Sequence, residues 1–410
     1  MIGTDAKDPP KETFEAAAKR ALESVRAALR EAIASIGADR INSLALSRLL
    51  RVDKSLSWRI VRFAQEPDVF VGGEHLPGDP GLRILTRALR GSHASHEAIE
   101  RLDDALAQLS QVVREHAGTR TAFRAMLLQC RRHDAHEDAT FEFRRMAFQA
   151  NAALWGIDVA TRSMMTVISG SRSKPGFVDI AMVGGFTRLR RMRHDLAWPV
   201  ARRRFRAPGA DGPPSSVRPL DPSVDPEGPP LVGAYSTIPP AALRPVKTSN
   251  GAWYELPETG IGSANEVSLV IGEHYEAIAP VVRTTDSENA ELMIQLDLPI
   301  ETLVFDLYVE RALPLGRPVT ARLFSQLLGG SAAPSPERER DALPMAERPV
   351  QVDDAEAPAA TQAIPRFAEL VEDVFAWLGR ARAGYDHFRL EIRYPMMPTA
   401  LVMALPLAEP

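Results

Sequence analysis

The stretch INSLALSRLLRVDKSLSWRIVRF, residues 41–63, predicts two short helices joined by a tight turn. On both sides of the turn, apolar residues recur at helical spacing or fill the turn itself: Leu44, Leu49, Leu50, Val52, Leu56, Ile60 and Phe63. Asp53 and Ser55 are both suitable caps for the second helix, because a short polar side chain can accept a hydrogen bond from the free amides of a first turn. The stretch therefore predicts a helical hairpin.

This hairpin is more basic than the chain around it. From Asp39 to Arg62 there are six basic and two acidic residues, a local charge of +4 in a chain whose formal charge is −4. A surface that faces DNA needs such local positive charge, because phosphate contacts supply much of the affinity. The negative total excludes a general affinity for nucleic acid, so any such binding must be local.

The hairpin resembles the helix-turn-helix of bacterial transcriptional regulators, in which a small residue lies where the helices cross and a hydrophobic residue fills the turn. Ser47 and Val52 match these two positions, whereas Arg51 stands where the family usually has Gly, and Ser57 where it usually has an aliphatic residue. The resemblance implies that the second helix enters the major groove of double-stranded DNA. The DNA-binding residues it implies are Arg48, Lys54, Ser55, Ser57, Arg59 and Arg62.

Trp58 lies within this set of positions, and its size favours burial in the core over a place in the groove. A second interpretation of the hairpin stays open. The two helices can pack as part of a structural or protein-interaction module, with the basic residues forming a solvated face.

Composition limits the protein class. The chain has 410 residues, enough for two or three domains, and 45% hydrophobic with 25% charged residues is ordinary globular composition. Cys130 is the only cysteine, which excludes an intramolecular disulfide framework. No apolar leader opens the chain and no run reaches the roughly 18 apolar residues of a membrane span, so we expect a cytoplasmic protein that does not engage a membrane.

The N-terminal half, residues 11–155, is predicted to be one helical domain that contains the hairpin. Helical spacing of apolar residues predicts a supporting helix over 12–36 and further helices over 95–117, 120–130 and 137–154, whereas Gly72 to Gly81 predicts a loop. The helix at 95–117 carries a heptad seam of Ile99, Leu102, Leu106, Leu109 and Val113. The seam is short for a coiled coil, so it favours a bundle helix and leaves a homodimer contact as the alternative.

The C-terminal half is predicted to be an α+β domain of residues 156–328 and 365–410, which makes the chain an α+β multidomain protein. Residues 207–230 predict a Pro-rich loop, and 329–364 a disordered insertion whose removal leaves the fold intact, because large apolar residues are scarce there. A helix is predicted over 367–381. Strands are predicted over 159–168, 177–183, 198–205, 266–271, 277–283, 291–296, 302–309, 388–394 and 401–405, with the last two rejoining the earlier sheet.

A second basic group lies between Arg188 and Arg206, with Trp198 and Phe205 interleaved. Arginines among aromatic residues can hold phosphates, although on a strand they also simply face water or pair with acids. The possible anion-binding residues are Arg188, Arg190, Arg191, Arg202, Arg203 and Arg204.

Metal and cofactor sites are not predicted. His133, Asp134, His136, Glu137 and Asp138 cluster, but two histidines on one helix face need a spacing of four, so a helix-capping turn is favoured. No nucleophile motif is present, and nothing in the sequence argues for an enzyme. An enzyme with a site in the C-terminal half stays open as a third interpretation, because catalytic carboxylates and histidines can converge from distant positions. The sequence favours a cytoplasmic, DNA-binding transcriptional regulator whose C-terminal domain binds a small-molecule or protein effector.

Overall fold

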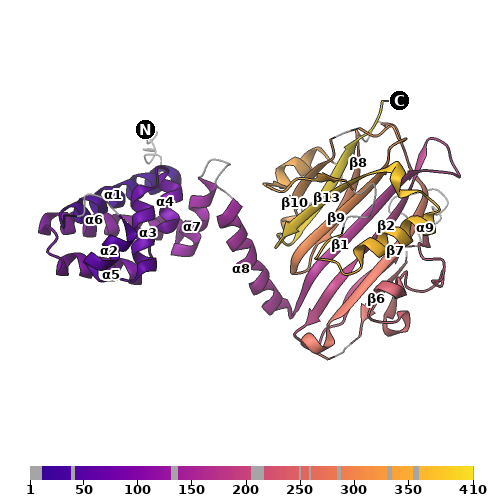
Figure 1. The fold of residues 1–410 in the computed structure, drawn as a ribbon, viewed down its shortest axis with the longest axis horizontal. Helices are drawn as coiled ribbons and strands as arrows, with labels where there is room; N and C mark the ends of the chain where they lie inside the picture. The colour runs from indigo at the N-terminus through magenta and orange to yellow at the C-terminus, as the bar shows by residue number, and fades with distance from the viewer. Residues whose placement is uncertain are drawn as a thin grey trace, which may run out of the picture. The chain divides into compact units, whose positions relative to one another are not determined.

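The chain forms two compact units, Met1–Thr140 and Phe141–Pro410, which we call the helical unit and the sheet unit. The computed structural model describes residues 12–37, 42–130, 137–204, 217–248, 251–257, 260–283, 288–316, 318–329, 335–353 and 360–409. The layout is α+β, with helices in the N-terminal part and sheets in the C-terminal part (Figure 1).

The described residues of the helical unit form short helices around one apolar core. The helices are α1 Phe14–Ala34, α2 Ser43–Leu50, α3 Lys54–Gln65, α4 Val69–His75, α5 Asp79–Gly91, α6 His96–Val112 and α7 Arg120–Gln129. The predicted supporting helix is α1, whose N-cap Thr13 accepts a hydrogen bond from the amide of Ala16. Its buried face includes Leu22, Val25 and Leu29, and burying each such side chain contributes about 1.5 to 3 kcal/mol.

The predicted loop at Gly72 to Gly81 is wrong, because this segment is mostly helical. It contains the end of α4 and the start of α5. A β-carbon on Gly73 would lie 2.8 Å from a methyl carbon of Leu127 and 3.0 Å from one of Leu22. Gly73 therefore lets α4 lie close to α1 and α7, and a glycine that serves packing looks like a loop residue in the sequence.

The heptad seam lies on α6 and its π-helical extension Val113–Ala117. Its residues Ile99, Leu102, Leu109 and Val113 are buried, and Leu106 is partly buried against the same core. The bundle-helix interpretation accounts for this burial. A homodimer formed through residues 95–117 would have to use the exposed side of the helix.

The last predicted helix of the N-terminal half, α8 Glu137–Trp155, falls mainly in the sheet unit. Phe141 and Phe148 contact the Tyr394 ring at centroid distances of 5.3 and 5.4 Å, and Arg144 forms an ion pair of 2.7 Å with Glu347. The division therefore falls after Thr140, and the predicted domain limit at residue 155 is too late.

The described strands form three sheets. A seven-stranded sheet, the large sheet, has the order β12-β13-β9-β1-β2-β7-β4; a four-stranded sheet has the order β11-β10-β14-β8; and a three-stranded sheet has the order β3-β6-β5. Neighbours in the large sheet are antiparallel except β1 and β9, which are parallel. The bounds are β1 Ile157–Gly170, β2 Phe177–Arg191, β3 Trp198–Arg204, β4 Val217–Pro219, β5 Arg244–Thr248, β6 Gly251–Leu256, β7 Val267–Pro280, β8 Asn289–Leu296, β9 Ile300–Glu310, β10 Thr320–Ser325, β11 Ala342–Leu343, β12 Val350–Val352, β13 Tyr385–Arg393 and β14 Thr399–Pro406.

The large sheet is covered on both faces, as the nearly continuous burial of β9 requires. Helix α9 Phe367–Leu378 lies across one face, where Val371 and Val374 are fully buried (Figure 1). On the other face, Leu303 and Phe305 pack with residues of the two smaller sheets. The core of the sheet unit is therefore layered, with helix, large sheet and smaller sheets in turn.

Several predicted strands match, with one difference of extent and one of pairing. The segments predicted over 266–271 and 277–283 belong largely to one strand, β7, which is bent at Ala277 with φ of 47°. The last two strands do rejoin the earlier sheets, but β13 pairs with β9 whereas β14 pairs with β8 and β10. The predicted loop over 207–230 contains the short strand β4 within its described part.

The described part of the predicted insertion over 329–364 contacts the sheets at several points, although many of its residues are exposed; residues 330–334 and 354–359 lie outside the described part. Strands β11 and β12 pair with β10 and β13. Arg338 forms an ion pair of 2.5 Å with Glu291, and both side chains are largely buried. Its guanidinium also lies 4.9 Å from the centre of the Phe324 ring. Few large apolar residues are present, but charged side chains with fixed partners attach the segment.

This attachment predicts that Arg338→Ala destabilises the sheet unit by about 1 to 3 kcal/mol, because Glu291 loses a charge-assisted bidentate partner in a mostly buried place. Urea unfolding of the full chain measures the loss. Arg348→Ala, which removes an exposed arginine of the same segment bonded to nearby carbonyls, is the matched control. An unchanged midpoint for Arg338→Ala would restore the view of the insertion as a passive loop.

Candidate nucleic-acid interface

Helices α2 and α3 are joined by Arg51, Val52 and Asp53. Arg51 adopts the left-handed conformation, with φ of 53° and ψ of 41°. This conformation explains why glycine suits the position, since a residue with a β-carbon adopts it at a cost. The Ser47 hydroxyl donates to the Val52 carbonyl at 2.7 Å, and the Val52 amide donates to the Ser47 carbonyl at 3.1 Å. These two bonds fix the crossing of the helices.

Asp53 caps α3, as its position in the sequence allows. Its carboxylate accepts a hydrogen bond from the Ser55 amide at 2.7 Å. Hydrogen bonds from Ser55, chiefly from its hydroxyl, lower the pKa of Asp53 below its usual range. The carboxylate is therefore charged at neutral pH. Its negative charge also interacts favourably with the positive, N-terminal end of the α3 helix dipole.

One stripe of α3 is exposed, because Ser55, Trp58 and Arg62 recur at helical spacing along it while the opposite side faces the core. Lys54 at its first turn is also exposed, as are Arg48 on α2 and Arg51 in the turn. None of Arg48, Arg51 and Lys54 has an ion-pair partner among the described residues. We call these six residues the recognition face: Arg48, Arg51, Lys54, Ser55, Trp58 and Arg62.

Two residues predicted to face DNA do not lie on this face. Ser57 is fully buried, and its hydroxyl donates to the Ser43 carbonyl, so it ties α3 to α2. Arg59 is half-buried and donates to the carbonyls of His75 and Leu76 at 3.3 and 3.1 Å, which closes the C-terminal end of α4. Partial burial, with a smaller effect of nearby Arg124, lowers the pKa of Arg59. Both side chains are structural.

The prediction that Trp58 lies in the core is wrong. The residue is 50% exposed, with its ring edge-on to His75 at 5.4 Å and the Arg62 guanidinium 5.9 Å from its centre. Leu44 and Leu49 are also 44% and 45% exposed, because α2 turns Leu46 and Leu50 inward instead. The spacing of apolar residues predicted the helices correctly, but it did not predict which side of each helix packs against the core.

The six arginines predicted as an anion site are divided between two strands of different sheets. Arg190 pairs with Asp158 at 2.5 Å, and Arg191, 1% exposed, donates to the carbonyls of Pro257 and Leu196. Arg188 is exposed at a bulge of β2. Arg202, Arg203 and Arg204 lie on β3 of another sheet. The internal partners of Arg190 and Arg191 argue against a shared phosphate site.

The sheet unit contains a pocket that the sequence did not indicate. It has a volume of about 800 Å³ and lies between the loop after Asp221 and the three-stranded sheet. Pro229, Leu231 and Leu243 give it apolar walls, and its charged lining residues are Asp225, Glu227 and Lys247. This volume is within the range of small-molecule sites, roughly 300 to 1,000 Å³.

Other candidate groups give no site among the described residues. His133, Asp134 and His136 lie outside them, and no three His, Cys, Asp or Glu side chains gather for a metal in the part that is described. Cys130 is partly buried, and this burial raises the pKa of its thiol, as expected for an unreactive cysteine. Within the described ranges, every helix is too short or too polar to cross a bilayer.

Comparisons with known proteins do not assign the chain to a family. No protein-family model and no curated protein matches it. Among solved structures, it is similar to a putative protease from Parabacteroides distasonis with 8% identity and a TM-score of 0.27. The match covers 62% of this chain and only 40% of the other. A score this low supports no argument about fold or activity.

Proposed function

We propose that the chain is a DNA-binding transcriptional regulator in which α2 and α3 act as a helix-turn-helix on double-stranded DNA. The observation that supports this most is the basic, exposed turn: Arg48, Arg51 and Lys54 surround it without an acidic partner among the described residues. In a helix-turn-helix, the exposed stripe of the second helix lies in the major groove. The regulator acts in the cytoplasm.

The recognition face separates into two kinds of contact. Ser55, Trp58 and Arg62 lie along the stripe, where they meet base edges; an arginine recognises guanine through two bonds, and an aromatic ring contacts a thymine methyl group. Arg48, Arg51 and Lys54 lie on α2, the turn and the first turn of α3, where they neutralise phosphates. The basic residues give a salt-dependent affinity, and the stripe gives sequence preference.

The sheet unit supplies the effector-binding part of this proposal. Its pocket of about 800 Å³ combines apolar walls with the charged side chains of Asp225, Glu227 and Lys247, so it suits a small molecule with an apolar body and a polar group. Binding there would regulate the DNA affinity of the helical unit only if the ligand favours one of two states of the chain. Titrating a small molecule that binds this pocket into the complex with DNA, and measuring the DNA affinity, tests that coupling.

The alternative is a protein-interaction module in which α2 and α3 serve only packing. The exposed Leu44 and Leu49 favour it, since apolar side chains on an outer helix face often mark a protein contact. Under this alternative the recognition face has no sequence preference for DNA.

Selection from a random DNA library, followed by affinity measurements at several salt concentrations, distinguishes the two. A helix-turn-helix selects a motif, and the logarithm of its affinity falls with that of salt by about 0.9 for each phosphate neutralised. Two half-sites one helical turn apart would indicate a dimer. No motif together with no salt dependence rejects DNA binding.

Arginine variants test the assignment of residues. Arg62→Gln weakens binding to the selected motif by about 1 to 3 kcal/mol because it removes a base-specific interaction, and adding Arg48→Gln brings a smaller, sequence-independent loss because it removes a phosphate contact. Folding is unchanged because both side chains are exposed. Arg59→Gln is the matched control. It keeps the DNA affinity but lowers stability by about 1 kcal/mol, since α4 loses its terminal bonds. The opposite pattern would place Arg59 on the DNA and reject the recognition face as defined.

A further inference from the structure

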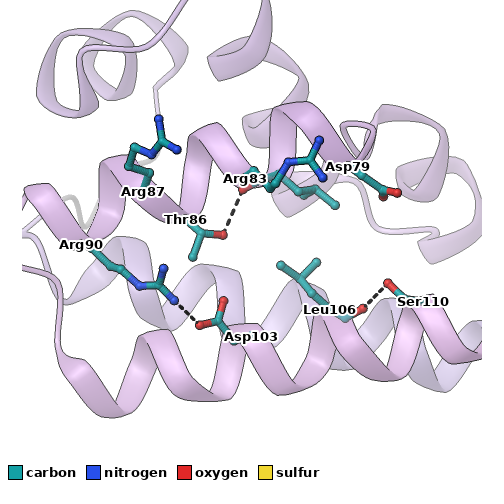
Figure 2. Close-up of a pocket in the computed structure, with 9 residues that line it drawn as sticks. Asp79, Arg83, Thr86, Arg87, Arg90, Asp103, Leu106 and Ser110 are labelled. Carbon is teal, nitrogen blue, oxygen red and sulfur yellow. Dashed lines mark hydrogen bonds and ion pairs between the residues drawn. The ribbon is translucent and has the colours of Figure 1, made fainter.

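A second basic site lies between α5 and α6 (Figure 2). The pocket has a volume of about 440 Å³, and Leu82 of α5 and Leu106 of α6 supply its apolar surface. Three arginines of α5 line it: Arg83, Arg87 and Arg90. They recur at i, i+4 and i+7, so they lie along one side of the helix. None of them belongs to the recognition face.

The charges around this pocket do not cancel. Arg90 pairs with Asp103 at 2.5 Å, and Asp79 pairs with Arg120 at 3.4 Å. Both carboxylates that line the pocket are therefore neutralised. Arg83 and Arg87 are exposed and have no hydrogen-bond or ion-pair partner within the described ranges, and Figure 2 shows them extending from α5 with no carboxylate joined to either. The site has two unneutralised positive charges.

Arg83 and Arg87 lie one turn apart on α5. Side chains four residues apart on a helix are neighbours, and like charges at this spacing repel each other. An anion between them removes this repulsion, and each planar guanidinium can donate two parallel bonds to phosphate oxygens. The hydroxyls of Thr86 and Ser110 already donate to the carbonyls of Leu82 and Leu106. The arginines are therefore the donors that can bind an anion in this pocket.

We propose that this pocket binds the phosphate group of a small anionic ligand, with Arg83 and Arg87 on the phosphate and the leucines against the rest of the molecule. The pocket volume of about 440 Å³ is large enough for a phosphomonoester that has an organic part. The same phosphate chemistry is also found in the backbone of DNA, so the experiment separates a free ligand from a DNA contact.

Calorimetric titration of the full chain with inorganic phosphate and with adenosine 5′-monophosphate, at constant ionic strength, tests the site. Arg83→Gln with Arg87→Gln should lower the affinity for both probes by about tenfold or more. Arg48→Gln with Arg62→Gln removes the same charge elsewhere in the helical unit and should leave it unchanged. For DNA we expect the reverse: Arg48→Gln with Arg62→Gln lowers the affinity, and Arg83→Gln with Arg87→Gln leaves it unchanged. The phosphate site and the proposed DNA interface can therefore fail independently. If Arg83→Gln with Arg87→Gln weakens DNA binding as much as phosphate binding, these arginines are a DNA contact and the proposal is overturned.

Asp103→Asn gives an independent measurement with an opposite sign. It releases Arg90 from its ion pair, so the affinity for both probes should rise severalfold. Arg83→Lys with Arg87→Lys keeps charge and helix propensity but removes the planar fork, and an affinity between those of the wild type and the glutamine pair is expected. No binding by the wild type at millimolar concentrations, or an affinity that Asp103→Asn leaves unchanged, overturns the proposal.

Discussion

Asp306→Ala should destabilise the sheet unit by about 3 to 5 kcal/mol, because it removes the carboxylate that neutralises a largely buried guanidinium. Asp306 is 1% exposed and lies on β9, on the face covered by α9. One of its oxygens accepts from the His387 ring and from Arg389, each at 2.7 Å. Tyr308 stacks on His387 at 4.2 Å, so the change also loosens a packed ring.

Urea unfolding followed by tryptophan fluorescence measures this loss in the sheet unit alone if Trp58→Phe is present as background, because the other four of the five tryptophans lie beyond residue 140. Asp306→Asn keeps an acceptor without the charge and should fall between the wild type and Asp306→Ala. Asp195→Ala removes an exposed carboxylate of the same unit and should leave the midpoint unchanged. Equal unfolding midpoints for Asp306→Ala and Asp195→Ala would show that the buried Asp306 carboxylate does not stabilise the sheet unit.

Gly185→Ala is the second large change that we expect. A β-carbon on Gly185 would lie 2.0 Å from the carbonyl oxygen of Leu269 and 3.0 Å from the α-carbon of Val270, both of them backbone atoms of β7. Backbone atoms cannot rotate away as a side chain can, so β2 and β7 must separate locally. Overpacking usually costs about 1 to 3 kcal/mol, and a backbone clash belongs at or above the top of that range.

Gly384→Ala is the matched control, since no atom lies within 4 Å of the added carbon and its backbone is not left-handed. In the same fluorescence assay, the midpoint of Gly384→Ala should stay close to that of the wild type. If Gly185→Ala has the same unfolding midpoint as Gly384→Ala, then β2 and β7 tolerate the added methyl group.

The sequence predicted those elements whose pattern is local. Helix α1 has uninterrupted helical spacing and a capping Thr13, and the run of apolar residues in β9 has strong β-propensity. The α5 arginines were missed as a site, although their spacing was visible, because a pocket depends on α6 lying beside them.

The errors at single residues concern partners that are distant in the sequence. Arg190 has Asp158 beside it only because β1 and β2 pair. Arg59 is structural because α4 ends beside α3, and Trp58 is exposed because the side of α3 that carries Ile60 and Phe63 faces the core. Periodicity places a side chain on a face of its own helix, but tertiary contacts decide what that face meets.

The parallel pairing of β1 with β9 determines when the sheet unit can form during synthesis. Met164 of β1 pairs with Phe305 of β9, and the strands between them do not complete the large sheet without β9. Until β9 leaves the ribosome, one edge of β1 and its apolar side chains stay open to other chains. Non-local pairing of this kind slows folding and exposes strand edges to aggregation. The helical unit ends before β1 begins, so it can fold first, and we expect the nascent chain to need a chaperone while β1 waits for β9.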